Sequence, residues 1–162
     1  MDLAEKKRIK LLHLKTTAGV GGAETLLEYW PKYLDKERFE QLAIFAENGP
    51  LIEKIKKSGM HVYCFPEMMG ARGLFEVRKL IRLIRENHID IMHAHGARVN
   101  LWGSLASLCT GVPIISTEHN IDLWRDNGFI FELIDRLSQK VNKYRVGVSQ
   151  AVCKMLLESG MP

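Results

Sequence analysis

Short apolar segments alternate along the chain with longer segments whose apolar positions recur at helical spacing. The apolar segments predict strands over residues 8–14, 41–46, 61–65, 90–95, 114–118 and 145–148. The longer segments predict helices over residues 23–34, 51–58, 74–87, 130–142 and 151–158, with a further helix ending at about residue 109. Because apolar strands alternate with helices, we expect an α/β fold, a doubly wound parallel sheet of about six or seven strands with helices on both faces.

Two of the predicted helices carry an additional signal. Pro31 lies inside the first helix and removes a backbone donor, so we expect that helix to kink or to restart there. The helix over residues 74–87 has basic residues between its apolar positions: Arg78, Lys79, Arg82 and Arg85. We expect this basic face to be solvated, with contact to acidic lipid as the alternative.

The composition favours one compact domain over residues 1–162, with 46% hydrophobic and 26% charged residues. A chain of 162 residues is too short for a (β/α)8 barrel, which needs about 250. The net charge of +4 is too small for a nucleic-acid-binding signature, so we expect no nucleic-acid partner. Three scattered cysteines and a charged first segment indicate a cytoplasmic location, and a peripheral position at the inner face of the membrane is left open.

A glycine-rich segment from Gly19 to Gly22 lies between the first predicted strand and the first predicted helix. Free N–H groups and the positive helix end would bind an anion there, and glycine lets a phosphate approach the backbone. The segment does not match the dinucleotide fingerprint G-x-G-x-x-G, because Glu24 stands at the third glycine, and it lacks the Lys-Ser/Thr of a P-loop. The alternative is that the glycines only turn the chain tightly into the helix.

Three histidines stand at the ends of neighbouring predicted strands. His93 and His95 alternate on one strand and therefore share a face, and His119 follows the next strand. These three could bind zinc, but an H-x-H motif is weak evidence; we expect no metal and interpret His93 as a hydrogen-bonded core residue. The polar run over residues 117–120 is hard to justify by packing, so it favours a polar ligand or proton transfer at His119.

Four motifs occur in order at the predicted strand ends: GVGGAE, DIMHAHG, GVPIISTEH and YRVGVS. Together they resemble the amino-terminal domain of retaining glycosyltransferases of family 4, over nearly the whole chain from about Ile9. The resemblance implies one Rossmann-like half of a GT-B fold. In such enzymes the amino-terminal domain chiefly binds the acceptor, a second domain binds the nucleotide-sugar donor, and the reaction takes place in the cleft between them.

The resemblance also implies roles for individual residues. Gly21 and Gly22 would approach the donor diphosphate and the acceptor, and His119 would contact the transferred sugar near its reacting carbon, as the catalytic residue. The other residues that would line the cleft or contact the acceptor are His95, Asn120 and Arg72. The nucleotide sugar would be a co-substrate, and no cofactor is expected.

The E-x7-E donor element of this family and its cations for the leaving diphosphate do not occur in this chain. We therefore expect the chain to be truncated at Pro162, before a carboxyl-terminal donor domain, and to be inactive alone. One alternative is a self-contained nucleotide-binding or small-ligand-binding domain, for which Glu47 is the one candidate ribose ligand. Another is a metallohydrolase that uses His93, His95 and His119. The sequence does not specify the sugar, the nucleotide base or the acceptor.

Overall fold

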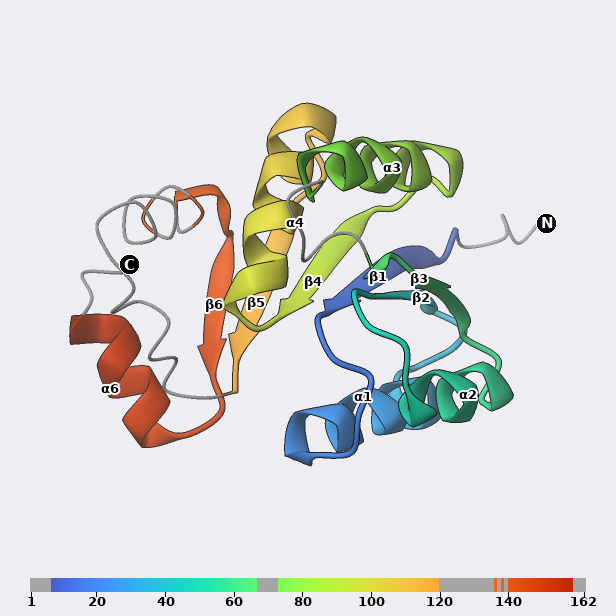
Figure 1. Ribbon diagram of the computed structural model, residues 1–162, viewed down its shortest axis with the longest axis horizontal. Helices are drawn as coiled ribbons and strands as arrows, with labels where there is room; N and C mark the ends of the chain where they lie inside the picture. The colour runs from blue at the N-terminus through green and yellow to red at the C-terminus, as the bar shows by residue number, and fades with distance from the viewer. Residues whose placement is uncertain (1–6, 67–72, 120–135, 137, 139, 159–162) are drawn as a thin grey trace, which may run out of the picture.

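The computed structural model describes residues 7–66, 73–119, 136, 138 and 140–158. Its six strands form one parallel sheet in the order β3-β2-β1-β4-β5-β6 (Figure 1). The strands are β1 Ile9–Lys15, β2 Phe39–Phe45, β3 His61–Cys64, β4 Ile91–His95, β5 Ile114–Glu118 and β6 Tyr144–Gly147. The expected doubly wound α/β fold is confirmed.

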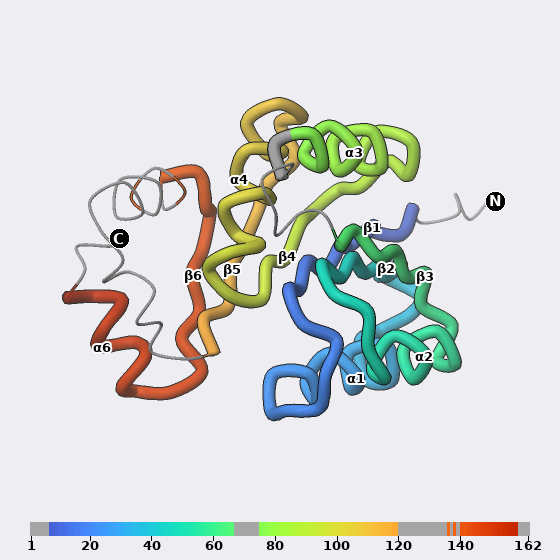
Figure 2. The backbone as a smooth tube through the Cα atoms, viewed as in Figure 1, coloured from blue at the N-terminus to red at the C-terminus, as the bar shows by residue number. Residues whose placement is uncertain are grey.

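Helices cover both faces of the sheet, with α1 and α2 on one face and α3 and α4 on the other (Figures 1 and 2). The helices are α1 Gly22–Tyr33, α2 Pro50–Lys57, α3 Gly73–Glu86, α4 Ala97–Thr110 and α6 Gln150–Glu158. Helix α1 continues through Pro31 to Tyr33, so the restart expected at this proline does not occur. Pro31 lies in the last turn, where the helix loses only one backbone hydrogen bond. The helix expected over residues 130–142 lies mostly outside the described residues.

Alternation along the strands separates two hydrophobic cores. Even-numbered residues of β1, β2 and β4 pack under α3 and α4: Leu12, Leu14, Leu42, Ile44, Met92 and Ala94. On the opposite face, Ala43 and Phe45 of β2 pack against α1 and α2. On that same face, the odd-numbered positions toward the carboxyl ends of β1 and β4 are polar: His13, Lys15, His93 and His95. One face of the central sheet therefore has an apolar half and a histidine-rich half.

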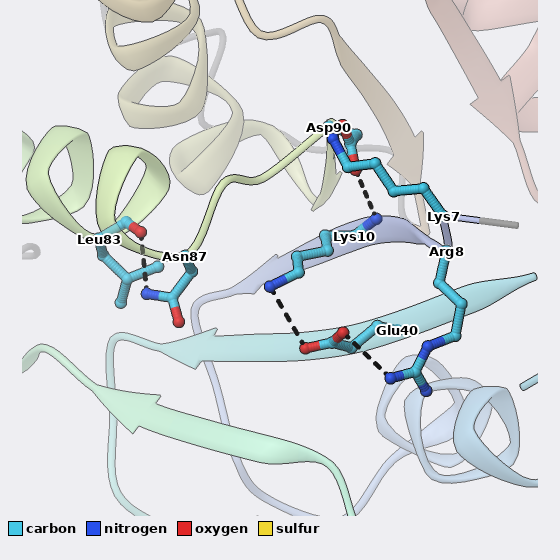
Figure 3. Close-up of polar contacts among 7 residues, drawn as sticks. All are labelled: Lys7, Arg8, Lys10, Glu40, Leu83, Asn87 and Asp90. Atoms are coloured by element: carbon cyan, nitrogen blue, oxygen red, sulfur yellow. Dashed lines mark hydrogen bonds and ion pairs between the residues drawn. The ribbon is translucent and has the colours of Figure 1, made fainter. Parts of the chain in front are cut away.

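Ion pairs hold the amino-terminal end of the sheet together (Figure 3). The backbone N–H of Lys10 donates to Asp90 Oδ2 at 2.9 Å, which ties β1 to the start of β4. The Lys10 ammonium lies 3.7 Å from Glu40 on β2, and the Arg8 guanidinium lies 3.5 Å from the same carboxylate. These charged groups thus have partners within the protein, and Gly21, Gly22, His95 and His119 lie at the other end of the strands.

The chain reverses its direction of winding between β1 and β4, which are neighbours in the sheet. Helix α1 leaves β1 toward one face and α4 leaves β4 toward the other, so a crevice is expected outside the carboxyl ends of these strands. Gly96 begins α4 there with a φ of 104°, a conformation that side chains rarely adopt. Its N–H donates to the Thr117 carbonyl at 2.9 Å and so joins the ends of β4 and β5.

Candidate functional site

The amino-terminal end of α1 lies beside the carboxyl end of β1. Gly21 is the N-cap of α1 and, as a glycine, has no side chain to cap the helix. A Cβ on Gly21 would lie 2.6 Å from Glu24 Oε2, whereas a Cβ on Gly22 would meet nothing within 4 Å. Gly21 is therefore constrained by its neighbour, but Gly22 faces open space at the positive end of a helix. That is the geometry expected of a site that an anion approaches.

A compact ion pair supports this helix end. Lys15 Nζ lies 3.3 Å from Glu24 Oε1, and Thr17 donates its hydroxyl to the same oxygen at 2.6 Å. Burial alone would raise the pKa of Glu24, but the hydrogen bonds from Thr17 and from backbone N–H and the charge of Lys15 together lower it. Glu24 is therefore ionised at neutral pH and neutralises Lys15, so it is unsuited to donate a proton.

Three buried histidines lie side by side on the α1 face of the sheet. The register places His13 opposite His93, and Lys15 opposite His95. His13 Nδ1 lies 3.2 Å from His95 Nε2, and His93 Nε2 lies 2.8 Å from the Thr117 hydroxyl. The Trp30 ring of α1 covers the group, with its centroid 4.9 Å from those of both His13 and His93. The interpretation of His93 as a hydrogen-bonded core residue is confirmed.

Burial keeps these imidazoles neutral at neutral pH. Loss of solvation, with a smaller contribution from a neighbouring histidine, lowers the pKa of His13 to about 3 and that of His93 to about 4. The pKa of His95 is also lowered well below its ordinary value, mainly by burial. A neutral imidazole offers one donor and one acceptor, so each of these rings has a defined direction of hydrogen bonding.

His119 is the half-buried member of this group and follows β5 directly. Its Nε2 lies 3.4 Å from His95 Nδ1, and the two rings stack with centroids 5.6 Å apart. Burial and the charge of Lys15 lower the pKa of His119, while Glu24 opposes that shift. His119 is therefore a neutral imidazole that reaches from the histidine group toward the carboxyl edge of the sheet.

The neighbouring polar residues of β5 serve the sheet itself. Glu118 is 1% exposed and lies 2.8 Å from the Arg145 guanidinium of β6, and Thr117 is the partner of His93. Packing therefore accounts for these two residues, contrary to the expectation that the whole polar run over residues 117–120 faces a ligand. Of this run, the described residue left to face a ligand is His119.

The structure brings together most of the residues that the sequence singled out. Gly21, Gly22, His95 and His119 all lie at the carboxyl edge of β1, β4 and β5. Arg72 and Asn120 lie outside the described residues. Sequence reasoning missed His13 and its partner Gln41; the one signal available was a single histidine inside the otherwise apolar segment Leu11–Leu14.

A metal ion would have different ligands from those considered in the sequence. The nitrogens that lie within 4.8 Å of one another belong to His13, His93 and His95, rather than to His93, His95 and His119. The separation of 3.2 Å between His13 and His95 suits either a hydrogen bond or two ligands of one ion. A divalent cation would lie near Lys15, and no carboxylate belongs to this group of three. These charges favour the hydrogen bond.

Comparison with known proteins gives one family. Residues 20–162 match the family model described as Glycosyltransferase Family 4. The chain is 26% identical over 139 residues to the UDP-Gal:alpha-D-GlcNAc-diphosphoundecaprenol alpha-1,3-galactosyltransferase of Escherichia coli, covering 83% of this chain and 34% of that protein. The chain thus spans about a third of the length of this curated relative.

Solved structures share the fold. Anabaena Alr3699/HepE in complex with UDP and glucose superposes with a TM-score of 0.76 at 20% identity, over 96% of this chain and 42% of that one. A glycosyltransferase from Rickettsia africae superposes with a TM-score of 0.71 at 19% identity, over 96% and 41% of the two chains. None of the helices within the described residues has the length and apolar character needed to span a membrane.

Proposed function

Because the chain belongs to glycosyltransferase family 4, we propose that it is the acceptor-binding amino-terminal domain of a retaining glycosyltransferase. A second domain would bind the nucleotide-sugar donor, and the sugar would pass to the acceptor in the cleft between the two domains. The observation that carries this proposal is that the α1 N-terminus and the half-buried His119 both lie at the carboxyl ends of the central strands, beside the switch point of the sheet.

A uridine diphosphate sugar is the donor that we propose. The Escherichia coli relative uses UDP-Gal by its name, and the Anabaena structure contains UDP and glucose. When the sugar leaves, negative charge develops on the diphosphate, and fixed N–H dipoles at a helix end stabilise such charge without reorganisation. Gly22 leaves the backbone of this helix end accessible, so we assign α1 a share in binding the diphosphate.

The carboxylates of this edge support a route without an enzyme nucleophile. Glu24 is held by Lys15 and Thr17, and Glu118 is buried against Arg145. A retaining glycosidase needs a free carboxylate opposite an acid, about 5 Å apart. Neither of these two glutamates of the described residues is free, so we propose that the acceptor attacks on the face that the diphosphate leaves. His119 would then hold the transferred sugar in place during the transfer.

We also propose a lipid-linked acceptor and a peripheral contact with the membrane. According to its name, the Escherichia coli relative acts on alpha-D-GlcNAc linked to diphosphoundecaprenol. Undecaprenol is a lipid. Helix α3 exposes Phe75 beside Arg78, whose guanidinium lies 5.9 Å from the ring centroid. A basic helix with an exposed aromatic residue suits peripheral contact with anionic lipid. Co-sedimentation with anionic vesicles, lost on Phe75→Ser, is the observation that would support it.

Titration of the full-length protein and of the 162-residue chain with a UDP-sugar tests whether the second domain binds the donor. We expect the full-length protein that contains this chain to bind a UDP-sugar by calorimetry and to release nucleotide on transfer. The 162-residue chain alone is expected to do neither. If the chain alone binds nucleotide at micromolar affinity, the alternative of a self-contained nucleotide-binding domain replaces the proposal. GDP- and ADP-sugars, titrated in parallel, test the choice of base.

Bulk at Gly22 is expected to weaken donor binding without unfolding the protein. Gly22→Ala should have a small effect and Gly22→Val should raise the donor Kd at least about tenfold, because one lost anion–backbone contact is worth about 1.4 kcal/mol. The melting temperature should not fall, since a Cβ there meets nothing within 4 Å. Equal donor affinity in both variants and the wild type would show that the diphosphate binds elsewhere.

A further inference from the structure

A chain of hydrogen bonds crosses four neighbouring strands on the α1 face of the sheet. It begins at Gln41 on β2, passes through His13 on β1 and His95 on β4, and ends at His119 after β5. Gln41 Oε1 lies 3.3 Å from His13 Nε2, His13 Nδ1 lies 3.2 Å from His95 Nε2, and His95 Nδ1 lies 3.4 Å from His119 Nε2. Each interior ring therefore uses both of its nitrogens within the chain.

One end of this chain fixes its direction. Gln41 Nε2 lies 3.3 Å from the Trp30 carbonyl, which can only accept a hydrogen bond. The amide nitrogen of Gln41 must therefore face Trp30, and its oxygen must face His13. This oxygen can only accept, so the proton of His13 lies on Nε2.

The direction then passes from ring to ring. Because His13 is neutral and protonated on Nε2, its Nδ1 is an acceptor, and His95 must donate from Nε2. The Nδ1 of His95 is then an acceptor, so His119 must donate from its own Nε2. The remaining nitrogen of His119, Nδ1, keeps its lone pair.

The surroundings of this chain of hydrogen bonds keep its two interior rings, His13 and His95, neutral. Burial lowers the pKa of His13 to about 3 and that of His95 well below its ordinary value. Within the part of the chain that the structure describes, the other titratable groups around these rings are His93 on β4, Lys15 on β1 and Glu24 on α1. Lys15 and Glu24 neutralise each other, and His93 is itself kept neutral by burial. No protonated ring therefore reverses the direction at neutral pH.

We propose that Gln41, His13 and His95 are positioning residues that hold the proton of His119 on Nε2 and leave its Nδ1 as an acceptor for a hydroxyl of the bound sugar. The inference rests on the proposed function, since it assigns His119 to the transferred sugar. An acceptor nitrogen attracts an O–H donor and repels a phosphate oxygen. His119 would thus select the sugar, while the helix end of α1 binds the diphosphate.

The direct test is the tautomer of His119 in the full-length protein. Long-range correlation of the ring protons with 15N in histidine-labelled protein distinguishes a protonated from a bare ring nitrogen, and the His119→Ala spectrum assigns the signals. We expect protonated Nε2 and bare Nδ1 in the wild type. An unprotonated Nε2, or a mixture of both tautomers, would overturn the inference. Either result would leave the proposed function as an acceptor-binding domain unchanged.

Removal of the anchor should release the tautomer. Gln41→Met keeps the length of the side chain but removes both polar atoms, so His13 is free to reverse, and His119 should become a mixture of tautomers. We expect kcat to fall about tenfold, the factor for one lost hydrogen bond, and the KM for the donor to change less. The lower limb of the pH–rate profile should also shift, which a purely structural defect would not cause. An unchanged tautomer in this variant would overturn the inference.

Thr117→Val is the matched control. It removes a buried hydrogen bond to His93 in the same group, but Thr117 and His93 lie outside the chain from Gln41 to His119. It should leave the tautomer and kcat unchanged, whereas equal losses in both variants would indicate general damage to the core and overturn the inference.

Bound metal at one equivalent, lost in a His13→Gln variant, would overturn the inference too, because metal ligation would occupy the ring nitrogens that form the chain of hydrogen bonds. Full turnover in His119→Ala would instead refute the proposed role of His119 in transfer, even with the tautomer as expected.

Discussion

Mild acid is expected to destabilise this domain strongly. Burial lowers the pKa of His13 from 6.5 to about 3 and that of His93 from 6.5 to about 4, so between pH 6.5 and 4.5 only the unfolded chain binds protons at these sites. Each site then removes about 1.4 kcal/mol of stability for each pH unit. The stability is fully present above pH 6.5 and is lost as the pH falls. Over two pH units the two sites together cost about 5 kcal/mol, against a total of about 5–15 kcal/mol for most domains.

Urea unfolding followed by circular dichroism at a series of pH values measures this effect. The slope of the unfolding free energy against pH should be steep between pH 6.5 and 4.5 in the wild type. His13→Gln should make the slope shallower, because one of the sites is gone, even if it also lowers stability at pH 7. His61→Gln is the control, since His61 is exposed on β3. A flat profile in the wild type would show that the three buried histidines are solvated or already charged.

The strands were predictable because parallel strands covered on both faces are mostly apolar along their whole length. The sequence predicted β5 with the bounds that the structure shows, and β1 within one residue at each end. Pro31 was a reasonable reason to expect an interruption of α1. The helix is not interrupted because the proline lies in its last turn, where few hydrogen bonds depend on it.

The histidine group was only half predictable. His93 and His95 share a face because they are two residues apart on one strand, and that follows from the sequence alone. His13 joins them because β1 pairs with β4 in one register, and His13 lies opposite His93. Register between strands far apart in sequence depends on the packing of both layers, so no local pattern specifies it. Gln41 on β2 is out of reach for the same reason.

The polar residues at the carboxyl end of β5 show how composition can mislead. Thr117, Glu118 and His119 are consecutive, but alternation sends Glu118 and its neighbours to opposite faces of the sheet. Glu118 forms an ion pair with Arg145 of β6, the strand next to β5 in the sheet. The sequence does not show which strands are neighbours, so it could not indicate this partner. A run of polar residues at a strand end thus combined a structural ion pair with a candidate site residue. The sequence could not separate the two.

Loss of the His119 side chain is expected to have the largest effect on activity. In the full-length protein, His119→Ala should lower kcat/KM for sugar transfer at least about a hundredfold, the range typical for removal of one group that acts on the transition state. The change should appear mainly in kcat, because the diphosphate would still bind at the helix end of α1. His119 is half-buried and shares one hydrogen bond, with His95, so the melting temperature should change little.

Two controls separate this effect from damage to the histidine group. His61→Ala removes an exposed histidine at the opposite edge of the sheet and should leave transfer unchanged. His119→Gln keeps an oxygen that can accept a hydrogen bond from a sugar hydroxyl. It should therefore retain part of the activity that His119→Ala loses, whereas His119→Leu should not. If the alanine, leucine and glutamine variants of His119 lose kcat/KM equally, binding of the transferred sugar does not depend on the acceptor nitrogen of His119. If none of them lowers kcat/KM, the role given to His119 is wrong, and the reacting groups must come from the residues outside this edge.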